Sequence, residues 1–115
     1  MADLTGARFD NKGLHFIKDP DANLVYGIDW TNYLNTGDTI SNKDVTIETI
    51  TGDSAPLAFP TNESTDVSVS GNKQVNIRLN GGTVGNEYNV DVKIITANGD
   101  TDSRRFRIIV KRKHL

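Results

Sequence analysis

The sequence predicts an all-β protein, an antiparallel β-sandwich of about seven strands. Three observations support this fold class. Apolar and polar residues alternate at a period of two in several short segments, which is the pattern of half-buried strands. Clusters of Gly, Asn, Asp and Pro separate these segments at short intervals. No segment carries the apolar spacing of an amphipathic helix.

Length and composition limit the fold further. A chain of 115 residues can bury one two-layer core but is too short for two domains. It contains no Cys, so neither a disulfide nor a thiolate metal site is available. The first ten residues lack the apolar stretch of a signal peptide, and no segment approaches membrane-spanning length. We therefore expect a soluble protein stabilised by burial and by hydrogen bonds between strands.

Two regions are expected along the chain. Residues 1–13 form an N-terminal arm that holds Leu4 and Phe9 but has no period long enough to predict a helix or a strand. Such an arm is either frayed or docked on another surface. Residues 14–115 form the sandwich, which ends in a basic strand and tail.

The sandwich is expected to begin with two strands. Residues 14–18 (LHFIK) form the first, and residues 19–23 (DPDAN) form a turn because Asp-Pro and Asn favour turns. Residues 24–30 (LVYGIDW) form the second strand. At a period of two, its buried face carries Leu24, Tyr26, Ile28 and Trp30.

The middle of the chain is expected to hold a further strand and a hairpin. Residues 45–50 (VTIETI) form the strand after a polar connection. Residues 56–60 (PLAFP) are a loop or an edge piece, because proline cannot donate a hydrogen bond to a neighbouring strand. Residues 66–70 and 74–79 alternate around the turn GNK and form the hairpin.

The last two strands are the longest alternating segments. Residues 87–96 form one, the turn ANGD follows, and residues 105–111 form the other. Together with the strand at residues 24–30, they are expected to enclose the core. The predicted core residues are Tyr26, Ile28, Trp30, Tyr88, Val90, Val92, Phe106 and Ile108.

Tyr88 stands at the start of the penultimate strand and leads its buried face. In sandwich domains, a tyrosine at this position can bond its hydroxyl back to the chain where the strands cross, an arrangement called a tyrosine corner. The sequence favours this arrangement. An ordinary buried tyrosine without that bond is the alternative, and both versions support a sandwich.

No active site is predicted. Asp19, Asp21 and Asn23 have the spacing of a calcium loop, but Leu24 and Trp30 occupy the positions of its glycine and its closing Glu, so a turn is favoured. His15 and His114 have no second partner for a metal site or for acid–base catalysis. A Gly-x-Ser-x-Gly nucleophile motif is also missing. The sequence therefore predicts no enzyme, no cofactor and no metal.

Aromatic residues offer one candidate for sugar binding. Tyr26 and Trp30 share their face with Leu24 and Ile28, so core packing is the favoured role for both. Tyr33 lies on the polar connection and is the only fair surface candidate.

Charge is distributed very unevenly along the chain. Residues 1–103 carry seven Lys/Arg and all fifteen Asp/Glu, a formal charge of −8, whereas residues 104–115 carry six Lys/Arg and no acid, a charge of +6. Three roles are open for this basic segment: a nucleic-acid patch, the solvated outer face of an edge strand, or a docking surface for an acidic partner. We favour docking over nucleic acid, and the candidates are Arg104, Arg105, Arg107, Lys111, Arg112 and Lys113.

Two segments carry a family resemblance. They are DPDANLVYGIDWTNYLNTGDTI and GGTVGNEYNVDVKIITANGDTDSRRFRIIV, which share an Asp-rich turn, a strand ending in Asp-Trp, a Gly-Asp-Thr-Ile segment and a final Gly-x-x-Tyr-x-Val hairpin. The chain resembles, from Lys18 to Lys111, the small immunoglobulin-like virion proteins of tailed bacteriophages known as fibre-tail adaptors.

This resemblance implies an immunoglobulin-like sandwich and a non-enzymatic structural role. Such proteins, in several copies per particle at the neck or tail, join fibres or neighbouring subunits to the virion after synthesis in the host cytoplasm. The expected partners are other virion proteins, with Leu4, Phe9, Tyr33 and the basic C-terminal residues as candidate contacts. A carbohydrate-binding or adhesive module and a capsid decoration protein are the alternatives.

Overall fold

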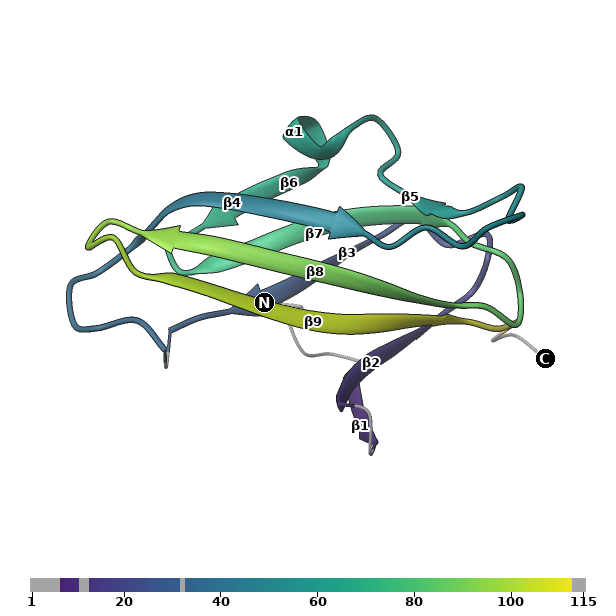
Figure 1. The fold of residues 1–115 in the computed structure, drawn as a ribbon, viewed down its shortest axis with the longest axis horizontal. Helices are drawn as coiled ribbons and strands as arrows, with labels where there is room; N and C mark the ends of the chain where they lie inside the picture. Colours follow the sequence, from purple (N-terminus) through teal and green to yellow (C-terminus); the bar gives the residue numbers. More distant parts are fainter. Residues whose placement is uncertain (1–6, 11–12, 32, 113–115) are drawn as a thin grey trace.

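The protein folds as two layers of β-strands (Figure 1). The computed structural model describes residues 7–10, 13–31 and 33–112, which form nine strands and one short helix. The molecule is elongated, with extents of 44 × 26 × 23 Å. The predicted two-layer β architecture is therefore confirmed, although one helical turn accompanies the strands, and the chain contains no Cys that could form a disulfide.

The larger sheet has five strands in the order β1-β2-β9-β8-β4. They are β1 (Ala7–Asp10), β2 (Gly13–Lys18), β9 (Thr101–Val110), β8 (Glu87–Thr96) and β4 (Ile40–Ile47). The smaller sheet has the order β3-β7-β5, and β6 also pairs with β7. Its strands are β3 (Leu24–Asp29), β7 (Gln74–Gly81), β5 (Leu57–Ala58) and β6 (Val67–Ser70).

The larger sheet is mixed rather than antiparallel. β2 runs parallel to β9, from the pair His15 and Arg107 to the pair Lys18 and Val110. The prediction of a wholly antiparallel sandwich is wrong here. Antiparallel neighbours are usually joined by a short turn, but β2 and β9 are separated by nearly the whole chain, so no hairpin fixes their relative direction.

Two strands and a helix lie in segments for which the side-chain pattern made no clear prediction. β1 lies inside the predicted arm and pairs with β2, and β5 is the short edge piece between Pro56 and Pro60. The backbone of Phe9 belongs to β1, but its side chain lies outside the described residues, as does all of Leu4.

The helix α1 (Glu63–Asp66) is a single turn defined by its caps. The side chain of Asn62 accepts a hydrogen bond from the backbone N–H of Thr65 at 2.8 Å. In return, Asp66 Oδ2 accepts bonds from the N–H groups of Asn62 and Thr61, at 3.0 and 2.7 Å. One turn is too short for an apolar period, so only these capping residues mark it in the sequence.

The hairpin of β6 and β7 follows its prediction. Gly71 and Asn72 both adopt positive φ, 58° and 64°, and Lys73 N donates to Ser70 O at 3.2 Å. Two consecutive positive φ angles characterise the tight turn that matches the twist of paired strands, and Gly and Asn tolerate them best.

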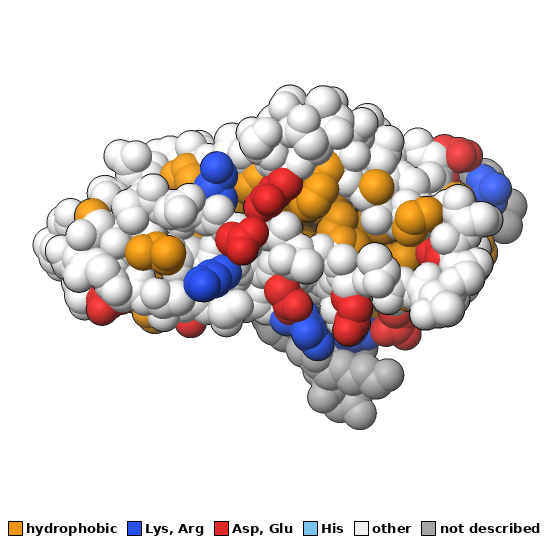
Figure 2. All heavy atoms as spheres, turned by 45° about the horizontal axis from the view of Figure 1, so that its top comes forward, with side chains coloured by type: hydrophobic (Ala, Val, Ile, Leu, Met, Phe, Trp, Pro, Cys, Tyr) orange, Lys and Arg blue, Asp and Glu red, His pale blue; other side chains and the backbone are white. Residues whose placement is uncertain are grey.

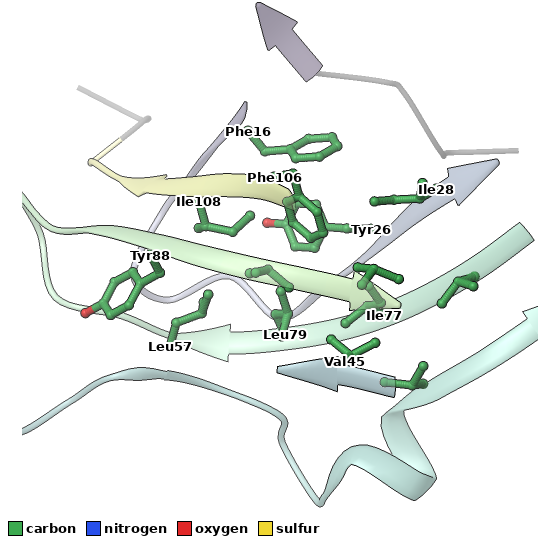
Figure 3. Close-up of a cluster of buried hydrophobic side chains, with 14 of the residues drawn as sticks. Phe16, Tyr26, Ile28, Val45, Leu57, Ile77, Leu79, Tyr88, Phe106 and Ile108 are labelled. Atoms are coloured by element: carbon green, nitrogen blue, oxygen red, sulfur yellow. The ribbon is translucent and has the colours of Figure 1, made fainter. Parts of the chain in front are cut away.

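The core lies between the two sheets (Figure 3). All eight residues predicted for it are buried. The ring of Phe16 makes edge-to-face contacts with Tyr26 and Phe106, with centroids 5.0 and 5.5 Å apart. Leu24 is an error of the prediction, because it is 49% exposed at the start of edge strand β3.

Candidate partner interface

The loops gather at two opposite ends of the sandwich (Figure 1). The end that we call the Trp30 end, at the left of Figure 1, carries residues 30–31, 33–39, 71–73 and 97–100. The end that we call the Tyr88 end carries residues 19–23, 48–56, 82–86 and 111–112. The residues predicted to contact partners are divided between these ends and the surface of β9.

Tyr88 forms the predicted tyrosine corner at its end of the molecule. Its hydroxyl accepts a hydrogen bond from the backbone N–H of Thr83 at 2.9 Å, five residues earlier in the chain. The same hydroxyl donates to the carboxylate of Asp53. Figure 3 shows the Tyr88 ring extending the core toward this end. The corner therefore joins the loop before β8 to the loop after β4.

Asp53 is the polar centre of this junction. Besides Tyr88, it accepts hydrogen bonds from Thr83 Oγ1 at 2.7 Å and from the N–H of Ala55 at 3.1 Å. Hydrogen bonds from the Tyr88 hydroxyl and then from Thr83 hold the pKa of Asp53 below its usual value, although desolvation opposes them. The hydrogen bonds of the folded loops therefore stabilise the charged form of Asp53.

Lys18 is a buried lysine that links the two sheets. Its side chain is wholly buried, and Nζ donates to the carbonyl oxygens of Gly81 at 2.7 Å and Asp19 at 2.9 Å. Burial lowers the pKa of Lys18, while the charges of Asp19 and Asp21 partly oppose this shift. Its amino group is therefore engaged inside the protein.

The Asp-rich segment before β3 is a turn, as favoured. Asp19 accepts a hydrogen bond from the N–H of Asp21 through its side chain, at 2.9 Å, and one from Ala22 through its carbonyl, at 3.0 Å. Among residues 7–10, 13–31 and 33–112, no group of three or more His, Asp or Glu could hold a metal ion.

The basic residues of β9 are paired within the chain. β9 lies between β2 and β8, so one of the three open roles, the solvated outer face of an edge strand, is excluded for it. Figure 2 likewise shows acidic and basic side chains next to one another on the face in view. The ion pairs of the candidates are Arg104–Asp102 at 3.1 Å, Arg105–Asp91 at 2.6 Å, Arg107–Glu87 at 2.8 Å and Arg112–Asp21 at 3.1 Å.

The four ion pairs differ in how much of each arginine side chain stays available to a partner protein. The Arg107 residue is only 7% exposed and lies beside His15, so it offers little surface. Arg105 binds Asp91 through two nitrogens, and this bond lowers the pKa of Asp91. Arg112 and Lys111 are exposed at the Tyr88 end, whereas Lys113 lies outside the described residues.

The Trp30 end brings two predicted contact residues together. The guanidinium carbon of Arg104 lies 5.4 Å from the ring centroid of Trp30 and 5.8 Å from that of Tyr33. Trp30 is fully buried, whereas Tyr33 is 39% exposed. Tyr33 and Arg104 are 71 positions apart in the sequence, so their proximity is a product of the fold.

Asp102 completes this cluster and was not a candidate from the sequence. Its Oδ2 accepts hydrogen bonds from Trp30 Nε1 at 3.0 Å and from Arg104 Nε at 3.1 Å. Burial raises the pKa of Asp102, but these two bonds and the charge of Arg104 outweigh it, and the pKa lies below its usual value. Every second residue of a strand shares a face, so counting back by two from Phe106 through Arg104 reaches Asp102 and could have identified it from the sequence.

The comparison with protein families decides where this chain belongs. Residues 18–109 match the family of the podophage GP4 fiber-tail adaptor protein gp77. The chain belongs to this family. It is therefore a non-enzymatic structural protein of the phage tail and part of the virion.

Membership confirms the resemblance seen in the sequence. As a gp77-family adaptor, the chain binds fibres and tail proteins of the particle. The search of curated proteins gave no match. Within the described part of the chain, no helix is long and apolar enough to cross a membrane.

Proposed function

We propose that this adaptor works as a rigid spacer whose two ends bind different virion proteins. One end would hold the tail and the other the fibre or a neighbouring subunit. The observation that carries this proposal is the placement of the loops. They lie at opposite ends of a body whose longest extent is 44 Å, and the two ends carry different chemistry.

The Tyr88 end supports a contact that depends on charge. Lys111 and Arg112 are exposed there, and Arg112 forms an ion pair with Asp21, which is itself largely exposed. An exposed ion pair contributes little to stability and can exchange partners readily. An acidic surface on a second virion protein is the partner that suits this end.

The Trp30 end supports a contact of another kind. Tyr33 and Arg104 belong to the residue types that carry most of the binding energy in protein interfaces. Both lie beside Trp30 on a surface supported by the core. The N-terminal arm, with Leu4 and Phe9, remains a predicted third contact.

The proposal includes two further features of the adaptor. The sandwich is of the immunoglobulin-like type, and its tyrosine corner supports this assignment. Several copies act in each particle, so that contacts that are individually weak add up. Counting copies by quantitative mass spectrometry of purified virions tests the second feature.

Photocrosslinking in assembled particles tests the two-ended arrangement. A benzoylphenylalanine is introduced at Val84, which is 48% exposed at the Tyr88 end, or at Asn98, which is exposed at the Trp30 end. We expect the two positions to crosslink to different virion proteins. Crosslinks from both positions to the same partner, or to the capsid shell alone, would overturn the proposal.

A further inference from the structure

We propose that Arg104 is a preformed receptor for a carboxylate side chain, Asp or Glu, on a partner virion protein. This inference deepens the proposed function and rests on it for the nature of the partner. Its basis is the cluster of Arg104, Trp30, Tyr33 and Asp102, which we call the Arg104 cluster.

The guanidinium of Arg104 is held in one orientation. Trp30 and Tyr33 both lie within 6 Å of it, measured from the guanidinium carbon to each ring centroid. Nε donates to Asp102 Oδ2 at 3.1 Å, and the indole N–H of Trp30 fixes that same oxygen at 3.0 Å. Because the side chain is already ordered, binding a ligand costs little additional conformational entropy.

The part of Arg104 that can bind a carboxylate is left available. Asp102 engages Nε, and the two terminal nitrogens form no hydrogen bond with any residue that the structure describes. The side chain is 45% exposed. A guanidinium offers parallel N–H groups that match the two oxygens of a carboxylate, so these nitrogens form a binding site for that group.

The position of Arg104 in β9 indicates a role other than stability. It pairs with Val92, and Asp102 pairs with Ile94, so both lie on the face of β9 that carries Phe106 and the core. Apolar residues at such positions would extend the core, and a partly exposed ion pair contributes little stability by comparison. The chain instead places a polar pair beside a fully buried Trp30.

Arg105 shows the contrast within the same strand. It lies on the outer face, has a similarly exposed side chain at 54%, and binds Asp91 through two nitrogens. Two of the Arg105 guanidinium nitrogens are therefore already bound to a carboxylate within the chain, whereas both terminal nitrogens of Arg104 are left for a partner. This difference makes Arg105 the matched control for Arg104.

A titration followed by NMR tests the site directly. The full chain, labelled with ¹⁵N, is titrated with capped glutamate and, in parallel, with capped glutamine. We expect saturable shifts of the Trp30 indole N–H and the Arg104 Nε–H with glutamate alone. Arg104→Gln should abolish the indole shift, and Arg105→Gln should leave it unchanged. Equal responses to glutamine, or no response to either compound, would overturn the proposal.

Two further variants separate binding from folding. Arg104→Lys keeps the positive charge but lacks the two parallel N–H donors of a guanidinium, so we expect glutamate binding to weaken by about tenfold or more. Tyr33→Phe keeps the ring and should bind as the original chain does. If Arg104→Gln does not fold, Arg104→Lys provides the same test. Tighter binding of an acidic sugar such as sialic acid would assign the site to glycans and contradict a protein partner.

Particle assembly gives the second measurement. In phage that carry Arg104→Gln, we expect the amount of virion protein crosslinked from position 98 to decrease by about tenfold or more. A loss of this size is typical of an interface hot spot. Arg105→Gln should leave it unchanged. If crosslinks from positions 84 and 98 identify two partners but Arg104→Gln loses neither, the carboxylate site is wrong and the two-ended adaptor stands.

Discussion

The hydroxyl of Tyr88 lies 2.9 Å from the backbone N–H of Thr83 and binds the carboxylate of Asp53 on its other side. One phenol thus fixes two loops of the Tyr88 end. Tyr88→Phe leaves the N–H of Thr83 without this acceptor, so we expect the free energy of unfolding to fall by about 1–3 kcal/mol. Urea denaturation measures the change. A loss below about 0.5 kcal/mol, the range of ordinary surface substitutions, would show that the corner does not stabilise the fold.

Tyr26 is expected to give the opposite result. Its hydroxyl is buried and has no hydrogen-bond partner among the described residues, and burial raises its pKa from 10.0 to about 12. Tyr26→Phe removes an unsatisfied polar group, so the stability should stay the same or rise by up to about 2 kcal/mol.

The titration of Tyr26 supplies a second test of the same variant. Above pH 10 the unfolded chain loses this proton before the folded chain does, so the original protein should lose stability as the pH rises toward about 12. Tyr26→Phe should show a smaller alkaline loss in thermal melts. Equal losses in both proteins would contradict burial of this hydroxyl.

The junction at Asp53 should weaken in acid. Its pKa in the folded chain is lowered, chiefly by the hydrogen bond from Tyr88. The carboxylate therefore contributes stability above its ordinary pKa, and this contribution is lost as the pH falls through the folded pKa. Thermal melts from about pH 6 to pH 2 should show a shallower acid loss for Asp53→Asn. Asp91 and Asp102, whose pKa values are also lowered, should account for part of the loss that remains.

Gly82 and Gly85 should respond very differently to alanine. Both have positive φ, 101° and 94°, so each Ala costs about 1–2 kcal/mol of backbone strain. A Cβ on Gly82 would also lie 2.7 Å from Val110 Cγ2, whereas one on Gly85 meets no atom within 4 Å. We expect Gly82→Ala to cost about 1–3 kcal/mol more in urea denaturation. Val110→Ala in the same chain should recover part of that difference, and purely additive losses would exclude the clash.

Glu63 is expected to protect the edge of β4. Its Oε2 accepts a hydrogen bond from the backbone N–H of Val45 at 2.7 Å, where the carbonyl of an added strand would lie. Glu63→Ala should accelerate amide hydrogen exchange at Val45 by about tenfold, and Glu63→Gln, which keeps an acceptor, should change it less. An unchanged exchange rate in Glu63→Ala would mean that the edge is protected by something else.

The strands that enclose the core could be predicted because their side chains alternate. Tyr88, Val90 and Val92 face inward in β8 as their period of two requires, and Phe106 and Ile108 do so in β9. A single-turn helix and a two-residue strand contain no such period, so α1 and β5 could not be predicted by the same argument.

The alternation of side chains could not predict which distant segments of the chain lie next to each other. The parallel pairing of β2 with β9 depends on how the chain crosses between the sheets, and no local turn specifies it. For the same reason, Tyr33 and Arg104 could be named as candidates separately, but their joint contact with Trp30 could not. Arg107 is buried where it contacts His15 of β2 and Glu87 of β8, and this neighbourhood depends on strand pairing, whereas the sequence indicated only that it lies on a basic strand.

The parallel pairing of β2 and β9 determines how the adaptor responds to pulling. A force that enters at Gly13 and leaves at Val110 acts along both strands, because the start of β2 and the end of β9 lie at opposite ends of their paired segment. The hydrogen bonds between the two strands are then loaded together in shear instead of opening one after another. Rupture has to break them at once, which raises the barrier that governs forced unfolding. Tension transmitted through these two strands is therefore resisted by their shared hydrogen bonds acting together.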